Sequence, residues 1–224
     1  ASYRYIISTP TFTTITDVDY PDTATEITAQ DEYFLAMDPT VIGRVWRSDA
    51  SAGISWSASA FFTAEAYGDK LVTIISDHRE LWLIGEKTSE VWINTGNAST
   101  TFERRDGILI EIGCQAKNSI AKSDNSLFWL ARDRNGEDII IRMDGFSPKI
   151  VSTRGISRQI ASFTTTSDAI GLAYRQDGHE FYVLTFPTEE RTFVYDTTTN
   201  LWHERASVQA GAQKRWRGQT HAFF

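Results

Sequence analysis

The sequence predicts an all-β fold of the β-propeller type, with four-stranded antiparallel blades of about 45–50 residues each. Three observations support this prediction: short runs of β-branched and aromatic residues bounded by turn-forming residues, scarce helical periodicity, and similar segments that recur at a long period. The clearest strand candidates are Val72–Ile75, Leu81–Ile84, Val91–Ile93, Ile139–Ile141 and Phe181–Leu184. The one helical pattern joins Ile156, Ile160 and Phe163 and predicts a single short helix.

Composition fits a folded chain with a sizeable core. Of the 224 residues, 41% are hydrophobic and 12% are aromatic, which argues against wholesale disorder. Lys and Arg number 22 against 29 Asp and Glu, so the formal charge is −7. This acidic balance disfavours a protein that grips nucleic acid over a broad basic surface. The sequence has no apolar run long enough for a transmembrane helix, and we expect no membrane partner.

The long-period repeat is marked by three aspartates, Asp77, Asp124 and Asp177, which lie 47 and 53 residues apart. Each is followed, four and five residues on, by an apolar pair that opens a strand. These pairs are Leu81–Trp82, Phe128–Trp129 and Phe181–Tyr182. We expect each aspartate to hold its hairpin turn by accepting hydrogen bonds from backbone N–H groups.

Further strands complete each repeat. We place one upstream of each aspartate (Val72–Ile75, Ser119–Ala121, Ile170–Tyr174), one after the next turn (Val91–Trp92, Ile140–Ile141, Val194–Tyr195), and a weaker one downstream (Phe102–Arg104, Lys149–Ser152, Leu201–Glu204). A partial copy at the start of the chain contains Tyr33–Leu35 and Val45–Trp46. The predicted units are 30–65, 66–112, 113–160 and 161–224, within a single domain over 1–224.

The physical reason for a propeller is burial. One meander cannot hide both of its faces, but neighbouring blades cover each other, and aromatic side chains fill the space between them. An irregular β-sandwich with similar hairpins remains the alternative. Because the chain starts within a strand pattern and ends on strand-like His221–Phe224, we expect blades beyond this chain and a longer natural protein.

Residues capable of chemistry are few and scattered. Cys114 is the one cysteine, and its apolar β setting indicates a buried structural thiol rather than a nucleophile. His78, His179, His203 and His221 lack metal-ligand spacing, and His78 and His179 are expected to be turn residues. We therefore nominate no catalytic, cofactor-binding or metal-binding residue, expect no cofactor, and expect that the protein is not an enzyme.

Three weaker signals have simpler explanations. Ser123–Trp129 only approximates the sialidase Asp-box Ser-x-Asp-x-Gly-x-x-Trp, because its spacing differs and it has no glycine. Asn97–Ser99 matches the N-glycosylation pattern by chance. Basic residues cluster at Arg104–Arg105 and Lys214–Arg217; a phosphate or base contact is one interpretation, and a charged strand edge is the favoured one.

Read as an ordered set, several segments resemble the packaged-DNA stabilisation proteins of short-tailed bacteriophages, also called tail accessory or hub proteins. The resemblance runs from about residue 30 to the end. The segments that carry it are Ser76–Leu83, Gly85–Thr88, Glu90–Trp92, Gly113–Cys114, Asp124–Leu130, Asp144–Pro148, Ser167–Ala169, Gly178–Pro187, Val194–Asp196 and Leu201–Arg205.

This resemblance implies a structural virion protein of the tail, assembled in the host cytoplasm. Several copies would form a ring below the portal and its adaptor, close the DNA channel after packaging and hold the tail needle, with a tailspike or fibre nearby. Packaged DNA would pass close by with weak or no direct binding. The alternative is a propeller-type binding module for a receptor or glycan, for which Trp46, Trp92, Trp202 or Trp216 would be candidates, although tryptophans at repeated positions are more often core residues.

Overall fold

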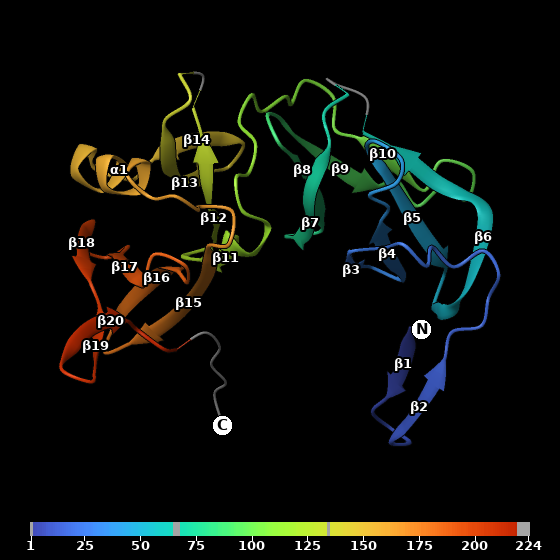
Figure 1. The fold of residues 1–224 in the computed structure, drawn as a ribbon. Helices are drawn as coiled ribbons and strands as arrows, with labels where there is room; N and C mark the ends of the chain where they lie inside the picture. The colour runs from blue at the N-terminus through green and yellow to red at the C-terminus, as the bar shows by residue number, and fades with distance from the viewer. Residues whose placement is uncertain (1, 65–67, 134, 219–224) are drawn as a thin grey trace. The chain divides into compact units, whose positions relative to one another are not determined.

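The computed structural model describes residues 2–64, 68–133 and 135–218 (Figure 1). Its regular structure is almost entirely β: four four-stranded antiparallel sheets, two two-stranded hairpins and one α-helix. In every four-stranded sheet the strands follow one another in sequence order, so each sheet is a meander. This confirms the prediction of an all-β chain with propeller-like blades; among the described residues no sheet closes on itself.

The chain divides into two compact units, the first of which is Ala1–Glu111. It contains one hairpin and two four-stranded sheets. The hairpin is β1 (Tyr3–Ile6) and β2 (Thr11–Thr14). The sheets are β3 (Glu26–Gln30), β4 (Tyr33–Met37), β5 (Arg44–Asp49) and β6 (Ala52–Thr63), then β7 (Leu71–Asp77), β8 (Glu80–Gly85), β9 (Ser89–Asn94) and β10 (Phe102–Arg104).

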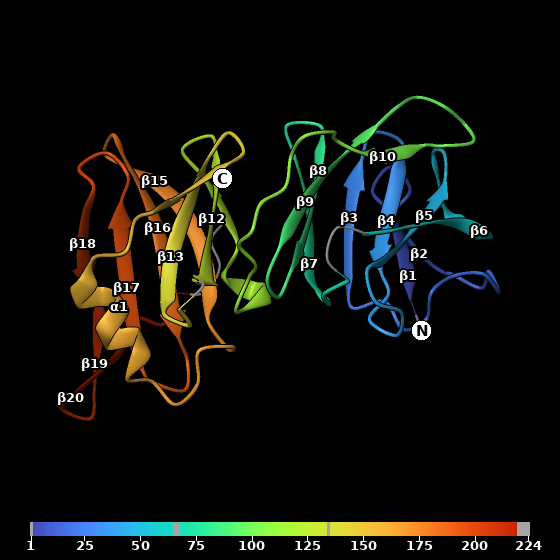
Figure 2. The same ribbon diagram turned by 90° about the horizontal axis from the view of Figure 1, so that it is seen from above.

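The second unit, Ile112–Phe224, contains two four-stranded sheets, a helix and a hairpin, which Figure 2 shows from above. A short 3₁₀ helix (Lys117–Ser119) leads into the first sheet. The other elements are β11 (Ala121–Ser123), β12 (Ser126–Arg132), β13 (Asp138–Asp144), β14 (Ser147–Ile150), α1 (Arg154–Ala161), β15 (Ile170–Gln176), β16 (His179–Phe186), β17 (Arg191–Asp196), β18 (Leu201–Glu204), β19 (Ala206–Gln209) and β20 (Ala212–Arg215).

Two predicted elements need correction. The predicted partial copy at the start is a complete four-stranded sheet: β3 and β6 flank the two predicted strands. The long strand β6 was missed because Gly, Ala and Ser dominate its first half and give no strand signal. The predicted strand at Ser119–Ala121 is also wrong, because the 3₁₀ helix runs to Ser119 and β11 begins only at Ala121.

Aromatic and aliphatic side chains fill the space between neighbouring sheets, as the burial argument requires. In the second unit, Phe128 of β12 stacks on Tyr182 of β16 with ring centroids 5.2 Å apart, and both side chains are fully buried. In the first unit, Leu35 and Val45 pack with Leu81 and Leu83 in one cluster. Each pair of consecutive sheets within a unit therefore shares a core.

The hairpin aspartates do not share one role. Asp124 and Asp177 lie in the tight turns and adopt positive φ angles of 47° and 52°, a conformation that aspartate tolerates better than most residues. The Asp124 carboxylate pairs with Arg142 at 2.7 Å. Asp77 instead ends β7, and the turn consists of His78 and Arg79 at φ 49° and 63°. The three aspartates are thus not structurally equivalent: in the β7–β10 sheet, Asp77 lies one residue before the turn position that Asp124 and Asp177 occupy in theirs.

In two sheets, an aspartate that lies two residues before the first strand of the sheet accepts backbone hydrogen bonds; we call this contact a clasp. Asp69 accepts hydrogen bonds from the N–H groups of Lys87 and Thr88, at 2.7 and 3.1 Å, and from the Thr88 hydroxyl at 2.9 Å. Asp168 makes the equivalent contacts with the N–H and hydroxyl of Thr188. Each clasp therefore ties the entry to one sheet to the turn between its second and third strands.

We predict that Asp69→Ala lowers the free energy of unfolding by about 1–2 kcal/mol, because it removes a charged acceptor shared by three donors. Urea unfolding followed by tryptophan fluorescence would measure the change. The matched control is Asp106→Ala, an exposed aspartate that should shift stability by less than about 0.5 kcal/mol. Equal effects of the two substitutions would show that the clasp contributes nothing.

Ser119 links the two sheets of the second unit through its side chain and its backbone. The Ser119 hydroxyl donates to the carbonyl of Ala116 at 2.7 Å and accepts from the N–H of Leu130 at 3.0 Å. The Ser119 carbonyl accepts from the hydroxyl of Tyr182 at 2.7 Å. Because β11 starts only at Ala121, the Ser119 side chain replaces the strand carbonyl that Leu130 would otherwise bond. The strand β15 passes closely beside this turn, at Gly171.

Candidate functional site

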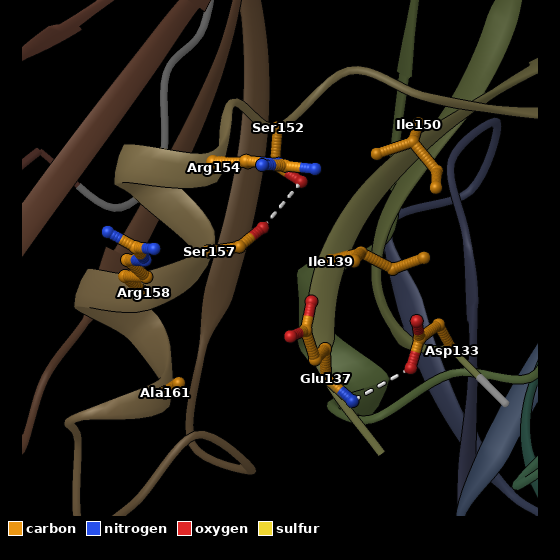
Figure 3. A pocket seen from close by; sticks show the side chains of 9 residues that line it. All are labelled: Asp133, Glu137, Ile139, Ile150, Ser152, Arg154, Ser157, Arg158 and Ala161. Carbon is orange, nitrogen blue, oxygen red and sulfur yellow. Dashed lines mark hydrogen bonds between the residues drawn. The ribbon is translucent and has the colours of Figure 1, made fainter. Parts of the chain in front are cut away.

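A pocket of about 440 Å³ lies in the second unit, between helix α1 and strands β13 and β14 (Figure 3). One wall is formed by α1 and the segment before it; the other is formed by β13, the end of β14 and the loop before β13. The lining residues are Asp133, Glu137, Ile139, Ile150, Ser152, Arg154, Ser157, Arg158 and Ala161.

The helical wall follows from a short amphipathic sequence. Thr153 caps α1, its hydroxyl accepting from the N–H of Ile156 at 3.3 Å. Ile160 is fully buried in the core of the unit, and Ile156 and Phe163 pack against the same cluster. The predicted helix is thereby confirmed. Because the apolar face of α1 packs against the core, the side chains of Arg154 and Ser157 on a different face of the helix line the pocket.

Two hydrogen bonds hold the helix start against the sheet. The Ser152 hydroxyl oxygen accepts from the N–H of Ile140 at 3.1 Å. It lies 3.0 Å from the Ser157 hydroxyl, which donates to it (Figure 3). Both serines are therefore engaged in structure, and the Ser157 hydroxyl points to another hydroxyl rather than to a base. This arrangement is suited to recognition rather than to nucleophilic chemistry.

The two walls carry opposite charges. Arg154 and Arg158 are exposed, lie one helical turn apart and have no ion-pair partner within the described residues. On the facing wall, Asp133 accepts from the N–H groups of Glu137 and Asn135, at 2.8 and 2.9 Å. The bond from Glu137 in particular lowers the pKa of the Asp133 carboxyl, so it is fully ionised at neutral pH.

Sequence reasoning missed this pocket, because its walls come from segments about twenty residues apart that only the fold brings together. The sequence does contain one signal, a pair of arginines at positions i and i+4 of a short helix, where two like charges destabilise the helix. A like-charged pair kept on an exposed helical face is a reason to look for an anionic partner.

The single cysteine lies where the sequence predicted. Cys114 is 3% exposed, and its Sγ lies 3.1 Å from the carbonyl oxygen of Ala116, to which it donates. Burial raises the pKa of the Cys114 thiol to about 11, so the thiolate is scarce at neutral pH. The thiol is therefore a core group, as expected, and not an activated nucleophile.

We predict that Cys114 in the folded protein reacts at least about 100-fold more slowly with Ellman's reagent at pH 7.5 than in 6 M urea. The rise in pKa from 9.0 to about 11 alone lowers the thiolate fraction by about that factor. The chain has one cysteine, so the absorbance change reports this residue alone. Equal rates in the folded and unfolded protein would contradict the prediction.

The histidines serve local contacts. His78 lies in the β7–β8 turn, as predicted, with its Nδ1 2.7 Å from Asp77 Oδ2. His179 is not a turn residue, contrary to the prediction: it is the first residue of β16, and its Nδ1 lies 2.7 Å from Asp196 Oδ2. Burial, followed by the charge of Arg205, lowers the pKa of His203. His221 and the predicted strand-like end His221–Phe224 lie outside the described residues. Among the residues that are described, no three His, Cys, Asp or Glu side chains gather in a metal-binding arrangement.

The tryptophans considered as glycan platforms mostly turn their indole N–H groups inward. Trp92 is buried and donates to Glu90 at 2.9 Å. Trp46 donates to Asp38 at 3.2 Å, and Trp202 donates to the carbonyl of Val151 at 2.8 Å. Trp216 is half-buried, with the Arg205 guanidinium 5.3 Å from its ring centre. These contacts favour structural roles.

The two basic clusters are partly neutralised. Arg105 pairs with Glu80, and Arg215 lies 4.0 Å from Glu190. Arg217 donates to the amide oxygen of Gln209, whereas Arg104 is exposed on β10.

Asn97 lies in the loop between β9 and β10, where its side-chain oxygen accepts from the N–H of Ser99 at 2.9 Å. In the part of the chain that the structure covers, no helix is both long and apolar enough to cross a membrane.

Comparisons with known proteins extend these observations. A family model described as "Bacteriophage P22 Gp10, beta-propeller", for phage stabilisation, matches residues 1–224, the whole chain. No curated protein matches the chain. Among solved structures, a putative 6-phosphogluconolactonase from Bacteroides fragilis is similar with a TM-score of 0.46 and 11% identity; the match covers 80% of this chain. It covers 52% of that protein, so the chain spans about half its length.

Proposed function

Because the chain belongs to the phage-stabilisation family of bacteriophage P22 Gp10, a β-propeller family concerned with packaged DNA, we propose that it is a tail hub protein. As a member of that family it is a phage structural protein and a component of the virion. In this proposal it assembles below the portal and adaptor in the tail, closes the DNA channel after packaging, and is built into the particle from subunits made in the host cytoplasm. The match over the whole chain is the observation that carries the proposal.

The architecture supports a passive structural role. Consecutive sheets in each unit share cores rich in aromatic side chains, and carboxylate clasps fasten their turns. The residues with reactive side chains, above all Cys114, are occupied by structural contacts. We therefore propose that the protein is not an enzyme and that it works by shape and by contact with its neighbours.

Electrostatics support weak contact with DNA. The formal charge of −7 opposes close association with the phosphate backbone, which lowers friction when DNA leaves the particle. In this proposal, retention of the genome depends on steric closure and on the seal with neighbouring tail proteins. Purified protein should accordingly bind duplex DNA weakly, whereas tight binding with a steep salt dependence would contradict this part of the proposal.

The proposed partners are other tail proteins: the portal-proximal adaptor, the tail needle, and a tailspike or fibre. We also propose a homo-oligomeric ring around the channel axis. A closed ring of one kind of subunit needs heterologous contacts, in which one patch of a subunit meets a different patch of the next. The alternative role, glycan or receptor binding by exposed tryptophans, receives less support because Trp46, Trp92 and Trp202 direct their N–H groups to partners within the protein.

The deciding experiment combines particle assembly with imaging. Virions assembled without the protein should lose their DNA after packaging, and restoring the protein should restore DNA-filled heads. Electron cryomicroscopy of complete virions should show its density as a ring on the channel axis, next to the adaptor. Peripheral density in a fibre, together with DNA-filled heads in its absence, would overturn the proposal in favour of receptor binding.

A further inference from the structure

We propose that the pocket beside α1 is an interface between copies of this chain, in which Arg154 and Arg158 bind acidic side chains from the first unit of a second copy. The inference rests on the proposed ring and deepens it, because it assigns one of the two surfaces that a head-to-tail contact requires.

The arginine pair differs from five other basic residues of the second unit. Arg132, Arg142, Lys149, Arg175 and Arg191 each pair with a carboxylate of the same unit. Arg154 and Arg158 have no such partner within the described residues, although they stand next to one another on α1. Each of these unpaired guanidinium groups can bind a carboxylate through two N–H groups.

The residues that line the pocket favour a protein partner over DNA. Two isoleucines line the pocket: Ile150 is 60% exposed and Ile139 is buried. Asp133 and Glu137 stand on the wall opposite the arginines (Figure 3). A phosphate backbone crossing the pocket would meet these carboxylates and be repelled, whereas a protein segment can present an acidic group to one wall and an apolar group to Ile150.

The uneven distribution of charge identifies the partner as a second copy. The first unit has 8 Lys and Arg against 17 Asp and Glu, a formal charge of −9, and the second has 14 against 12, a formal charge of +2. The whole acidity of the chain thus belongs to its first half. When copies associate, this difference favours contact between the first unit of one and the second unit of another.

A charge reversal in the pocket tests this interface. In sedimentation velocity of the full chain at low salt, Arg158→Glu should weaken self-association at least tenfold, and 0.5 M NaCl should weaken the unaltered protein in the same direction. The matched control is Arg217→Glu, which makes the same change of charge in the same unit outside the pocket. Circular dichroism and thermal unfolding of both variants establish that they are folded.

A second measurement identifies the partner residue. Arg158→Lys keeps the positive charge and supplies an amine that carbodiimide can join to a carboxylate in contact with it. Mixing ¹⁴N- and ¹⁵N-labelled protein before the reaction separates links between copies from links within one copy. We expect mixed-isotope links from position 158 to an Asp or Glu within residues 1–111.

The outcomes separate this inference from the proposed function. Self-association that Arg158→Glu and Arg217→Glu weaken equally, or links confined to one copy, would overturn the interface but leave the ring intact. A chain that stays monomeric at every concentration would overturn the interface too. The location of the protein in the virion is tested independently by the imaging described above.

Discussion

Gly171→Ala is expected to lower the free energy of unfolding by at least about 3 kcal/mol, which is at the upper end for a single added methyl group. A Cβ atom at this position would lie 2.0 Å from the carbonyl oxygen of Ser119 and 2.7 Å from its carbonyl carbon. Both are backbone atoms, so no side chain can rotate away. Relief requires that β15 or the 3₁₀ helix move, which would break the bond from Tyr182 to the Ser119 carbonyl.

The chain offers a matched control for this substitution. Gly155 lies in helix α1, where a new Cβ would meet nothing closer than the Thr153 hydroxyl at 3.8 Å. Gly155→Ala should therefore be neutral or stabilising by about 0.5–1 kcal/mol, as for other glycines in helices. Chemical denaturation of the two variants provides the comparison. Similar midpoints would mean that the two sheets do not approach each other at Gly171.

Phe128→Ala is expected to cost about 3–5 kcal/mol, the usual range for removing a buried aromatic ring. The Phe128 side chain is 0% exposed and contacts rings of the next sheet, with centroids 5.2 Å from Tyr182 and 6.1 Å from Tyr195. The substitution removes apolar surface from both sheets at once and leaves a cavity between them. Urea unfolding at neutral pH would measure the loss.

The control for Phe128 is Phe12, which is 76% exposed on β2. Phe12→Ala removes the same atoms but should change stability by no more than about 0.5 kcal/mol, because its ring contacts chiefly Tyr5 of the same hairpin. A small effect at Phe128 would mean that neighbouring sheets do not depend on each other for burial, and the physical argument for a propeller-like stack would be lost.

Much of the fold was predictable because strand signals are local. Runs such as Leu81–Ile84 and Phe181–Leu184 combine β-branched and aromatic residues and lie within β8 and β16. Failures occurred where local preference and tertiary context diverge. Strand β6 is rich in small residues yet pairs with β5, with two register shifts. The segment before β11 forms a 3₁₀ helix, in which the Ser119 hydroxyl accepts a hydrogen bond from Leu130.

The pocket and the close approach at Gly171 were beyond sequence reasoning. Both depend on pairs of segments that are distant in sequence: Asp133–Glu137 with Arg154–Arg158, and Ser119 with Gly171. Neither member of a pair carries a distinctive motif by itself, so no local pattern indicates that they meet. The absence of an activated cysteine, by contrast, followed from the apolar neighbours of Cys114.

The contacts of Ser119 have a consequence for how the second unit opens. Repeat architectures are commonly treated as arrays whose modules can unfold one after another. Here a single residue closes the turn before β11, completes the hydrogen bonding of β12 and receives the Tyr182 hydroxyl from β16. Neither sheet can detach without exposing orphaned polar groups on the other. The unit should accordingly behave as one foldon, its deeply protected amides sharing a common exchange free energy.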